Sequence, residues 1–300
     1  MRVVLHIGPH KTGSTLIQSH IHENVEALTS QGIFPANELA PRYITKLRNN
    51  LRRLQNAGRV APDFSALGPA SAHVLQTARE AGAHTVLVSE ENIPGMPFHR
   101  QMVTGADRVG FYPDAEACLR LVASGFGDVP LKLLVFTRRQ DSLLVSHYAE
   151  ALRSLQIDQT LDEFIARIDL CGLRFSDLIK RIQRGAPKAD IAITPFETIS
   201  QGTIPFLTAF FAAVGAEPDA LSLSNTVVRS RVGRTTAEQL VEIARQFKAG
   251  GRPQMLKRQA RRTVAAANPA DPPLALPADL LADLTERYGD DLSYRPIASA

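Results

Sequence analysis

The chain has 300 residues, of which 44% are hydrophobic and 21% charged, the proportions of an ordinary soluble globular protein. These values exclude a largely disordered chain and a fibre, and the length allows one large domain or two small ones. The net charge of +4 is modest, tryptophan is absent and aromatic residues make up 6%, which makes a nucleic-acid partner a poor match. Two cysteines, Cys118 and Cys171, are too few for a disulfide framework or a structural zinc site.

Membrane and targeting signals are also missing from the pattern. No segment approaches the roughly 18 consecutive apolar residues of a membrane-spanning helix. The apolar run at the N-terminus covers only residues 3–7 before Gly8 interrupts it, which is too short for a signal peptide. We therefore expect a cytoplasmic enzyme with no transmembrane segment.

The first part of the chain alternates strand and helix signals. Residues 3–7 are mostly apolar and partly β-branched, as in a buried parallel strand. A glycine-bearing loop at 8–13 follows, and apolar residues then recur at helical spacing over 16–28. Residues 41–82 are mostly helical in pattern, with a break marked by glycines and prolines. Residues 85–88 predict a second strand.

The middle of the chain contains the strongest strand signal. Glycines and prolines punctuate residues 94–113, which predicts a loop, and residues 115–124 predict a helix. Five of the seven residues over 131–137 are apolar, so a strand is expected there. A helix follows, with an apolar stripe over 143–152 on which His147 is expected to be a core histidine.

The last part of the chain adds a strand and several helices. Residues 191–194 predict a fourth strand, and residues 204–214 and 278–288 predict helices. Two capping-box patterns mark further helix starts: Thr160-x-x-Glu163 and Thr235-x-x-Glu238.

Strands that alternate with helices favour a parallel sheet with helices on both faces. We therefore predict an α/β fold, a three-layer αβα sandwich with a central parallel sheet and additional helices. One domain over residues 1–300 is expected, with a helical C-terminal part from roughly residue 235 onward. Residues 229–262 hold ten lysines or arginines and two acids, and could contact a nucleotide, bind an anionic acceptor or form a solvated helical face.

The first loop has the pattern Gly8-x-x-x-x-Gly13-Ser14-Thr15. A glycine loop that enters a helix presents unpaired N–H groups and a partial positive charge, which suit a phosphate. The spacing is that of a nucleoside-triphosphate P-loop as far as the second glycine, where that loop continues with a lysine. Here Ser14 takes that place and the lysine lies at position 11. The alternative interpretation is an ordinary strand-to-helix turn.

The loop resembles the 5′-phosphosulfate-binding loop of the sulfotransferases that use 3′-phosphoadenosine 5′-phosphosulfate (PAPS). The resemblance is carried by the run His10-Lys11-Thr12-Gly13-Ser14-Thr15. In that family the loop directly follows the first strand and reads roughly Pro-Lys-Ser/Thr-Gly-Thr/Ser-Thr. The animal cytosolic enzymes have proline where this chain has His10, whereas bacterial members vary more at that position, so we expect a bacterial member.

A second motif supports the same resemblance. The family has an arginine at the end of a central strand and a serine eight residues later, which together bind the 3′-phosphate. Arg138 and Ser146 match this pattern. The alternatives are an ion pair of Arg138 with Asp141 and a plain helical serine. In the animal cytosolic enzymes an Arg-Lys-Gly-x-x-Gly stretch closes over the nucleotide, and this chain has no such stretch. Of the arginines near residue 233 we select Arg231 as its substitute in nucleotide binding, with Arg229 and Arg234 as alternatives.

The resemblance implies that the αβα sandwich is of the P-loop nucleotide-hydrolase-like type. It also implies transfer of a sulfonate from PAPS to a hydroxyl or amine of an acceptor, with no metal required. Lys11 would neutralise the charge on the leaving oxygen, and residues 12–15 would bind the 5′-phosphate. Glu90 follows the strand at 85–88 and is the expected base, with Glu91 and His99 as alternatives. His10 could also take part, by hydrogen-bonding the sulfonate.

Two other functions stay open. A small-molecule or nucleotide kinase would need a lysine after Gly13 and an acidic metal-binding residue at a strand end, but the strand at 131–137 is followed by Arg138 and Arg139. A non-catalytic nucleotide-binding module is the other alternative. The acceptor could be a carbohydrate, a lipid, a small molecule such as a phenolic metabolite, or a peptide. The variable segments 41–82, 94–113 and 155–185 are expected to form its site.

Overall fold

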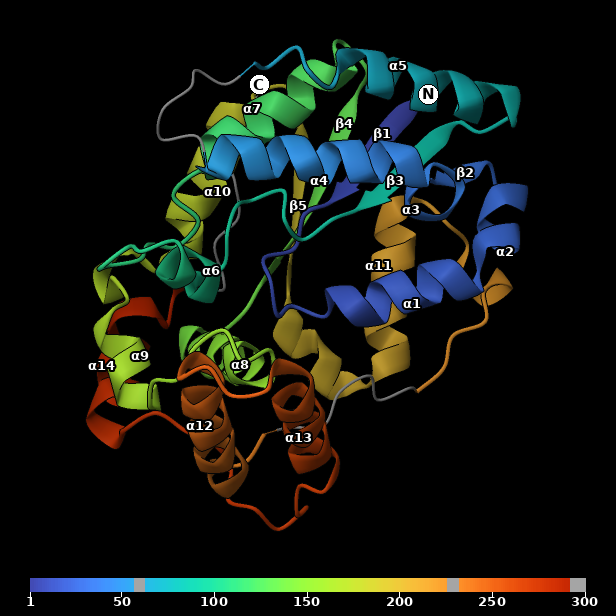
Figure 1. Cartoon of the computed structure of the whole chain (residues 1–300). Helices are drawn as coiled ribbons and strands as arrows, with labels where there is room; N and C mark the ends of the chain where they lie inside the picture. Colours follow the sequence, from blue (N-terminus) through green and yellow to red (C-terminus); the bar gives the residue numbers. More distant parts are fainter. Residues whose placement is uncertain (57–62, 226–231, 292–300) are drawn as a thin grey trace.

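The computed structural model describes residues 1–56, 63–225 and 232–291. Five strands form one sheet in the order β2-β3-β1-β4-β5, with every neighbouring pair parallel (Figure 1). The strands are β1 (Arg2–His6), β2 (Ile33–Pro35), β3 (Thr85–Ser89), β4 (Leu131–Thr137) and β5 (Asp190–Pro195). Their carboxyl ends meet at one edge of the sheet, the edge at which open α/β sheets bind ligands.

Helices cover both faces of the sheet (Figure 1). One face is covered by α1 (Ser14–Glu23), α2 (Val25–Ser30) and α11 (Thr203–Val214). The other face is covered by α4 (Pro41–Asn56), α5 (Gly68–Glu80), α7 (Ala115–Phe126) and α10 (Phe175–Gly185). Along β1, Val3 and Leu5 pack on the second face and Val4 on the first, the alternation of a strand buried on both sides. The predicted three-layer αβα fold is confirmed.

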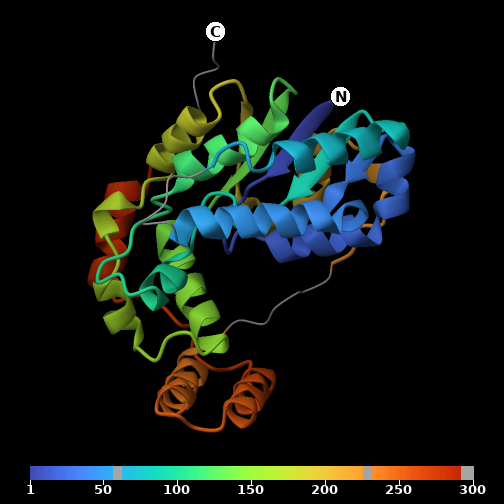
Figure 2. The ribbon, with the colours of Figure 1, turned by 45° about the horizontal axis from the view of Figure 1, so that its top comes forward.

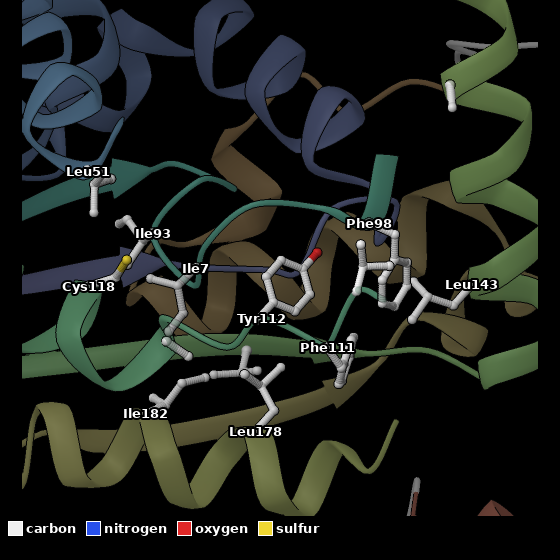
Figure 3. Packing of buried hydrophobic residues seen from close by; sticks show 14 of the residues in the cluster. Ile7, Leu51, Ile93, Phe98, Phe111, Tyr112, Cys118, Leu143, Leu178 and Ile182 are labelled. Carbon is white, nitrogen blue, oxygen red and sulfur yellow. The ribbon is translucent and has the colours of Figure 1, made fainter. Parts of the chain in front are cut away.

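The larger core lies between the sheet and the helix layer that contains α4, α5, α7 and α10. Figure 3 shows Ile7 at the end of β1 and Ile182 of α10 among the side chains that fill it. The Cys118 thiol is buried in the same core and forms no disulfide. Tyr112 also lies there, and Figure 3 shows its hydroxyl oxygen in red among the apolar side chains. The core therefore reaches as far as the loop that follows β1.

The remaining helices lie beyond the carboxyl edge of the sheet. α8 (Gln140–Arg153) begins just after β4 and is contacted by the helices of the C-terminal region (Figure 2). These helices are α12 (Arg234–Lys248), α13 (Pro253–Ala265) and α14 (Ala278–Tyr288). Shorter helices are α3 (Ala36–Leu39), α6 (Phe98–Val103) and α9 (Leu161–Ala166). In the described part of the chain, no helix is both long enough and apolar enough to cross a membrane.

Several element predictions need correction. The edge strand β2 was not predicted, because three residues are too few to show a period. The helix predicted over 16–28 is two helices, since the Asn24 amide turns to bond the backbone of Ser222, which interrupts the helix. Residues 94–113 contain the short helix α6 within the predicted loop.

The two capping-box predictions have different outcomes. Thr160 and Glu163 form both reciprocal bonds and start α9, as predicted. The prediction at Thr235 is wrong: α12 begins one residue earlier, and the Asp271 carboxylate accepts the N–H groups of Thr235 and Thr236 at 3.0 and 2.9 Å. This helix is therefore capped by an aspartate from a distant part of the chain, and not by a side chain of its own first turn.

Candidate active site

The loop between β1 and α1 is sharply bent. Lys11 and Gly13 both have left-handed backbone conformations, with φ of 74° and 90°, and α1 starts immediately afterwards at Ser14. The Thr12 hydroxyl donates to the Pro9 carbonyl at 2.6 Å and closes the bend from within. A left-handed conformation at a residue other than glycine costs about 1 kcal/mol or more, so the loop holds Lys11 in a position that the rest of the structure enforces.

Gly8 is required at the start of this bend. A Cβ atom at this residue would lie 2.8 Å from both His6 Nε2 and Thr12 Oγ1. Its contacts are buried side chains that cannot move aside cheaply. The first glycine of the pattern therefore serves close packing, whereas Gly13 serves the positive φ.

His10 fixes the outer part of the loop to the core. Its backbone N–H donates to the Tyr112 hydroxyl at 2.8 Å, and its ring Nδ1 lies 3.1 Å from the same oxygen. Burial and the charge of Arg100 lower the pKa of His10 to about 3, so the imidazole is neutral at physiological pH. The loop is anchored through this tyrosine, which comes from a segment a hundred residues away.

Lys11 and Arg138 meet at the carboxyl edge of the sheet. Arg138 follows β4, donates from Nη1 to the Lys11 carbonyl and from Nε to Ser142 Oγ at 2.9 Å, and stacks on the Phe196 ring at 4.8 Å. The neighbouring arginine, Arg139, forms the ion pair with Asp141. The two sequence motifs are thus joined by a direct hydrogen bond across the ends of β1 and β4.

A pocket of about 1200 Å³ opens over this edge. The predicted donor-binding residues that line it are His10, Lys11, Gly13, Ser14, Thr15, Arg138 and Ser146. Thr12 is fully buried inside the loop and does not line it. Ser14 Oγ is buried at the start of α1 and has no hydrogen-bond partner within the described residues. An unpaired hydroxyl beside a helix N-terminus suits an anionic oxygen.

Glu90 lies behind the pocket wall. Its side chain is fully buried, accepts from Arg48 Nε at 2.5 Å and from the Asn92 amide, and does not line the pocket. Burial and the neighbouring charge of Glu91 raise the pKa of Glu90, against the opposing effects of Asn92 and Arg48. The alternatives Glu91 and His99 both line the pocket. Glu90 therefore has the environment of a structural carboxylate.

Glu150 of α8 was not among the predicted site residues. Its Oε2 accepts from Lys11 Nζ at 3.1 Å, and the two side chains are 28% and 18% exposed on the pocket wall. The signal that could have identified it is its spacing, because it lies four residues after Ser146 and therefore on the same helix face. The family motif ends at Ser146 and does not include this position.

Two of the predicted nucleotide-binding arginines, Arg229 and Arg231, lie outside the described residues. Arg234 is the first residue of α12, is exposed and does not line the pocket. Val232 and Gly233 do line it. Within the ranges that the structure describes, no three or more His, Cys, Asp or Glu side chains are grouped so as to hold a metal ion.

Buried histidines around the loop predict acid sensitivity. Burial lowers the pKa of His6 to about 4 and the pKa of His99 to about 3, whereas an unfolded histidine has a pKa of about 6.5. Between these values the unfolded chain binds protons that the native chain does not, so the free energy of unfolding falls as pH falls below about 6.5. At pH 5 the expected loss is about 2 kcal/mol for each of the two.

Urea denaturation at pH 7, 6 and 5 measures this effect. The midpoint is expected to fall at each step, and His6→Gln is expected to make the fall shallower. A midpoint that does not change between pH 7 and pH 5 contradicts the prediction.

The fold and the loop define an α/β protein with a glycine-bearing loop and a pocket at the carboxyl edge of its parallel sheet. No protein-family sequence model and no curated protein matches the chain. Among solved structures it is similar to a sulfotransferase from Alicyclobacillus acidocaldarius, with 11% identity and a TM-score of 0.40 over 86% of this chain and 99% of the other. Because this similarity is low, functional assignment rests on the site alone.

Proposed function

We propose that this protein is a sulfotransferase that uses PAPS as sulfonate donor. The observation that carries the proposal is that two motifs meet in one pocket, which is lined both by the Lys11 loop and by Arg138 and Ser146. Either motif alone has an ordinary structural explanation. Their convergence from distant parts of the chain onto one edge of the sheet is what a donor with phosphates at both its 5′ and 3′ positions requires.

The residues present fit such a donor. Ser14 and Thr15 begin α1, where N–H groups and the Ser14 hydroxyl are available to the 5′-phosphate. Arg138 and Ser146 are assigned to the 3′-phosphate, and the Arg138 guanidinium stacks on the Phe196 ring. When bound, PAPS supplies the activated sulfonate.

Lys11 and Glu150 divide the chemistry between them. As the bond from sulfur to the bridging phosphate oxygen breaks, charge grows on that oxygen, and Lys11 Nζ stabilises it. The new bond forms between sulfur and the acceptor oxygen, and the acceptor proton passes to the Glu150 carboxylate. We assign the base to Glu150 because it lies on the pocket wall 3.1 Å from Lys11 Nζ, whereas Glu90 is enclosed by Arg48 and Asn92.

Calorimetric titration tests the donor assignment. We expect the product nucleotide, 3′-phosphoadenosine 5′-phosphate (PAP), to bind without metal and more tightly than 5′-AMP. Arg138→Ala should weaken the binding of PAP by about 10- to 100-fold, the effect of losing a charge-assisted hydrogen bond. It should also abolish the preference for PAP over 5′-AMP. Arg139→Ala is the matched control, since Arg139 pairs with Asp141 and does not line the pocket.

The ratio of the two affinities makes the test specific. Because Arg138 also supports the Lys11 carbonyl, its loss could disturb the whole loop, but such a disturbance would weaken PAP and 5′-AMP alike. A preference for ATP with magnesium that is indifferent to Arg138→Ala would overturn the proposal in favour of a kinase. Absence of binding by all three nucleotides would favour a module of another kind.

A further inference from the structure

Tyr112 is a buried side chain whose backbone is strained and whose hydroxyl meets the loop between β1 and α1. Its φ of 52° is left-handed, a conformation that a residue other than glycine keeps only where the surrounding structure enforces it. Arg181 of α10 provides this support, since its Nη1 and Nη2 atoms donate to the Tyr112 and Phe111 carbonyls at 2.6 and 2.8 Å. The ring packs in the larger core and does not line the pocket. The hydroxyl is therefore held in a fixed place beside the loop.

The Tyr112 hydroxyl determines which nitrogen of the His10 ring is protonated. It accepts from the His10 backbone N–H at 2.8 Å and lies 3.1 Å from His10 Nδ1. Among the described residues, no other group is bonded to this hydroxyl. A buried hydroxyl proton needs an acceptor, so the Tyr112 proton goes to Nδ1. That nitrogen must then be the unprotonated one.

The Asn92 side chain indicates the same state of the ring. Its amide NH₂ donates to the Glu90 carboxylate, which leaves Asn92 Oδ1 as the acceptor, and Arg100 Nη1 donates to that oxygen at 3.3 Å. Burial lowers the pKa of His10 most, and a hydrogen bond with Asn92 opposes this effect, as an oxygen that accepts from a protonated ring nitrogen does. Because Nδ1 faces the Tyr112 hydroxyl, the nitrogen that donates to Asn92 is Nε2.

We propose that Tyr112 and Asn92 clamp the His10 ring in one tautomer, with its proton on Nε2, and that Tyr112 is thereby a positioning residue for Lys11. The backbone N–H and both ring nitrogens of His10 are then bonded to protein, so the residue directly before Lys11 is fixed at three points. In this arrangement His10 acts through the backbone of the loop and does not bond the sulfonate. The role toward Lys11 rests on the proposed function, whereas the tautomer does not.

NMR of protein that carries ¹⁵N-labelled histidine tests the tautomer directly. The two nitrogens of a neutral imidazole have different shifts, which depend on which of them is protonated. His10 is identified among the eight histidines as the signal that His10→Leu removes. At pH 7 and without nucleotide, we expect His10 only in the form protonated on Nε2. A mixture of tautomers, or a ring protonated on Nδ1, would overturn the inference.

A matched pair of tyrosine variants tests the positioning role. Tyr112→Phe keeps the ring in the core but removes the hydroxyl, so the His10 Nδ1 signal should move toward that of a nitrogen that accepts no hydrogen bond. The rate of sulfonate transfer should fall by about tenfold, the effect of one hydrogen bond, and PAP affinity should fall by less. Tyr43→Phe should change neither the signal nor the rate, since Tyr43 is buried in the same core against Phe126 and does not line the pocket.

The two measurements separate the ways in which the inference can fail. An unchanged Nδ1 signal in Tyr112→Phe would show that the hydroxyl does not bind the ring, and would overturn the clamp. A shifted signal with the rate of Tyr43→Phe would overturn the positioning role. Absence of a preference for PAP over 5′-AMP in the wild-type protein would overturn the proposed function itself, and the NMR result on the tautomer would still stand.

Discussion

Lys11→Ala is expected to lower the rate of sulfonate transfer by about 10²–10³-fold, the effect of removing one charged donor from a developing oxyanion. The left-handed backbone at residue 11 and the Arg138 bond to its carbonyl fix where the side chain starts. The Nζ atom therefore needs little reorganisation when charge develops on the leaving oxygen. Conversion of PAPS to PAP in the presence of a phenol acceptor, separated by chromatography, measures the rate.

Two controls separate chemistry from loop structure. PAP affinity should fall by less than the rate does, because the 5′-phosphate can still bind the N–H groups at the start of α1 and the Ser14 hydroxyl. Lys11→Arg retains a positive charge on the loop and should recover part of the rate, though less than all of it, since a guanidinium is larger and planar. If Lys11→Ala lowered rate and PAP affinity by the same factor, the lysine would be a binding residue and its assignment to the leaving oxygen would be wrong.

Four of the five strands were predictable because the local sequence encodes them, whereas the short edge strand β2 was not. The strand predicted at residues 131–137 coincides with β4, where a continuous apolar run is buried on both faces. The strand predicted at residues 85–88 differs from β3 by one residue. Features set by distant contacts were not predictable: Asn24 interrupts a helix by bonding Ser222, and Asp271 caps a helix that starts 37 residues earlier.

The candidate site divides in the same way. The order of strands places the end of β1 next to the end of β4, so the loop and Arg138 could be expected to meet once a parallel sheet was assumed. The base that we propose, Glu150, could not be predicted in this way. Glu90 does follow β3, as expected, but Arg48 and Asn92 hold its side chain away from the pocket. Which way a carboxylate turns at a strand end depends on partners that the local sequence does not reveal.

Glu150→Gln is expected to lower the rate of transfer by about 10²–10⁴-fold, the usual contribution of a general base. Glutamine keeps the size and hydrogen-bonding capacity of the side chain but cannot take the acceptor proton. PAP affinity should stay the same or increase, because Lys11 loses an anionic partner at 3.1 Å that a bound phosphate would otherwise have to replace. A fall in rate together with unweakened PAP binding distinguishes a base from a residue that merely orders the loop.

Glu90→Gln is the decisive comparison. It can replace the acceptor oxygen that faces Arg48 Nε with an NH₂ group that cannot accept, so the free energy of unfolding should fall by about 1–3 kcal/mol, which urea denaturation measures. The rate of transfer by the folded protein should change by far less than in Glu150→Gln, since Glu90 does not line the pocket. If instead Glu90→Gln abolished transfer and Glu150→Gln left it intact, the base would be Glu90. The pocket would then have to open toward Arg48 during turnover, and Arg48→Ala, which removes that partner of Glu90, should in that case raise the rate.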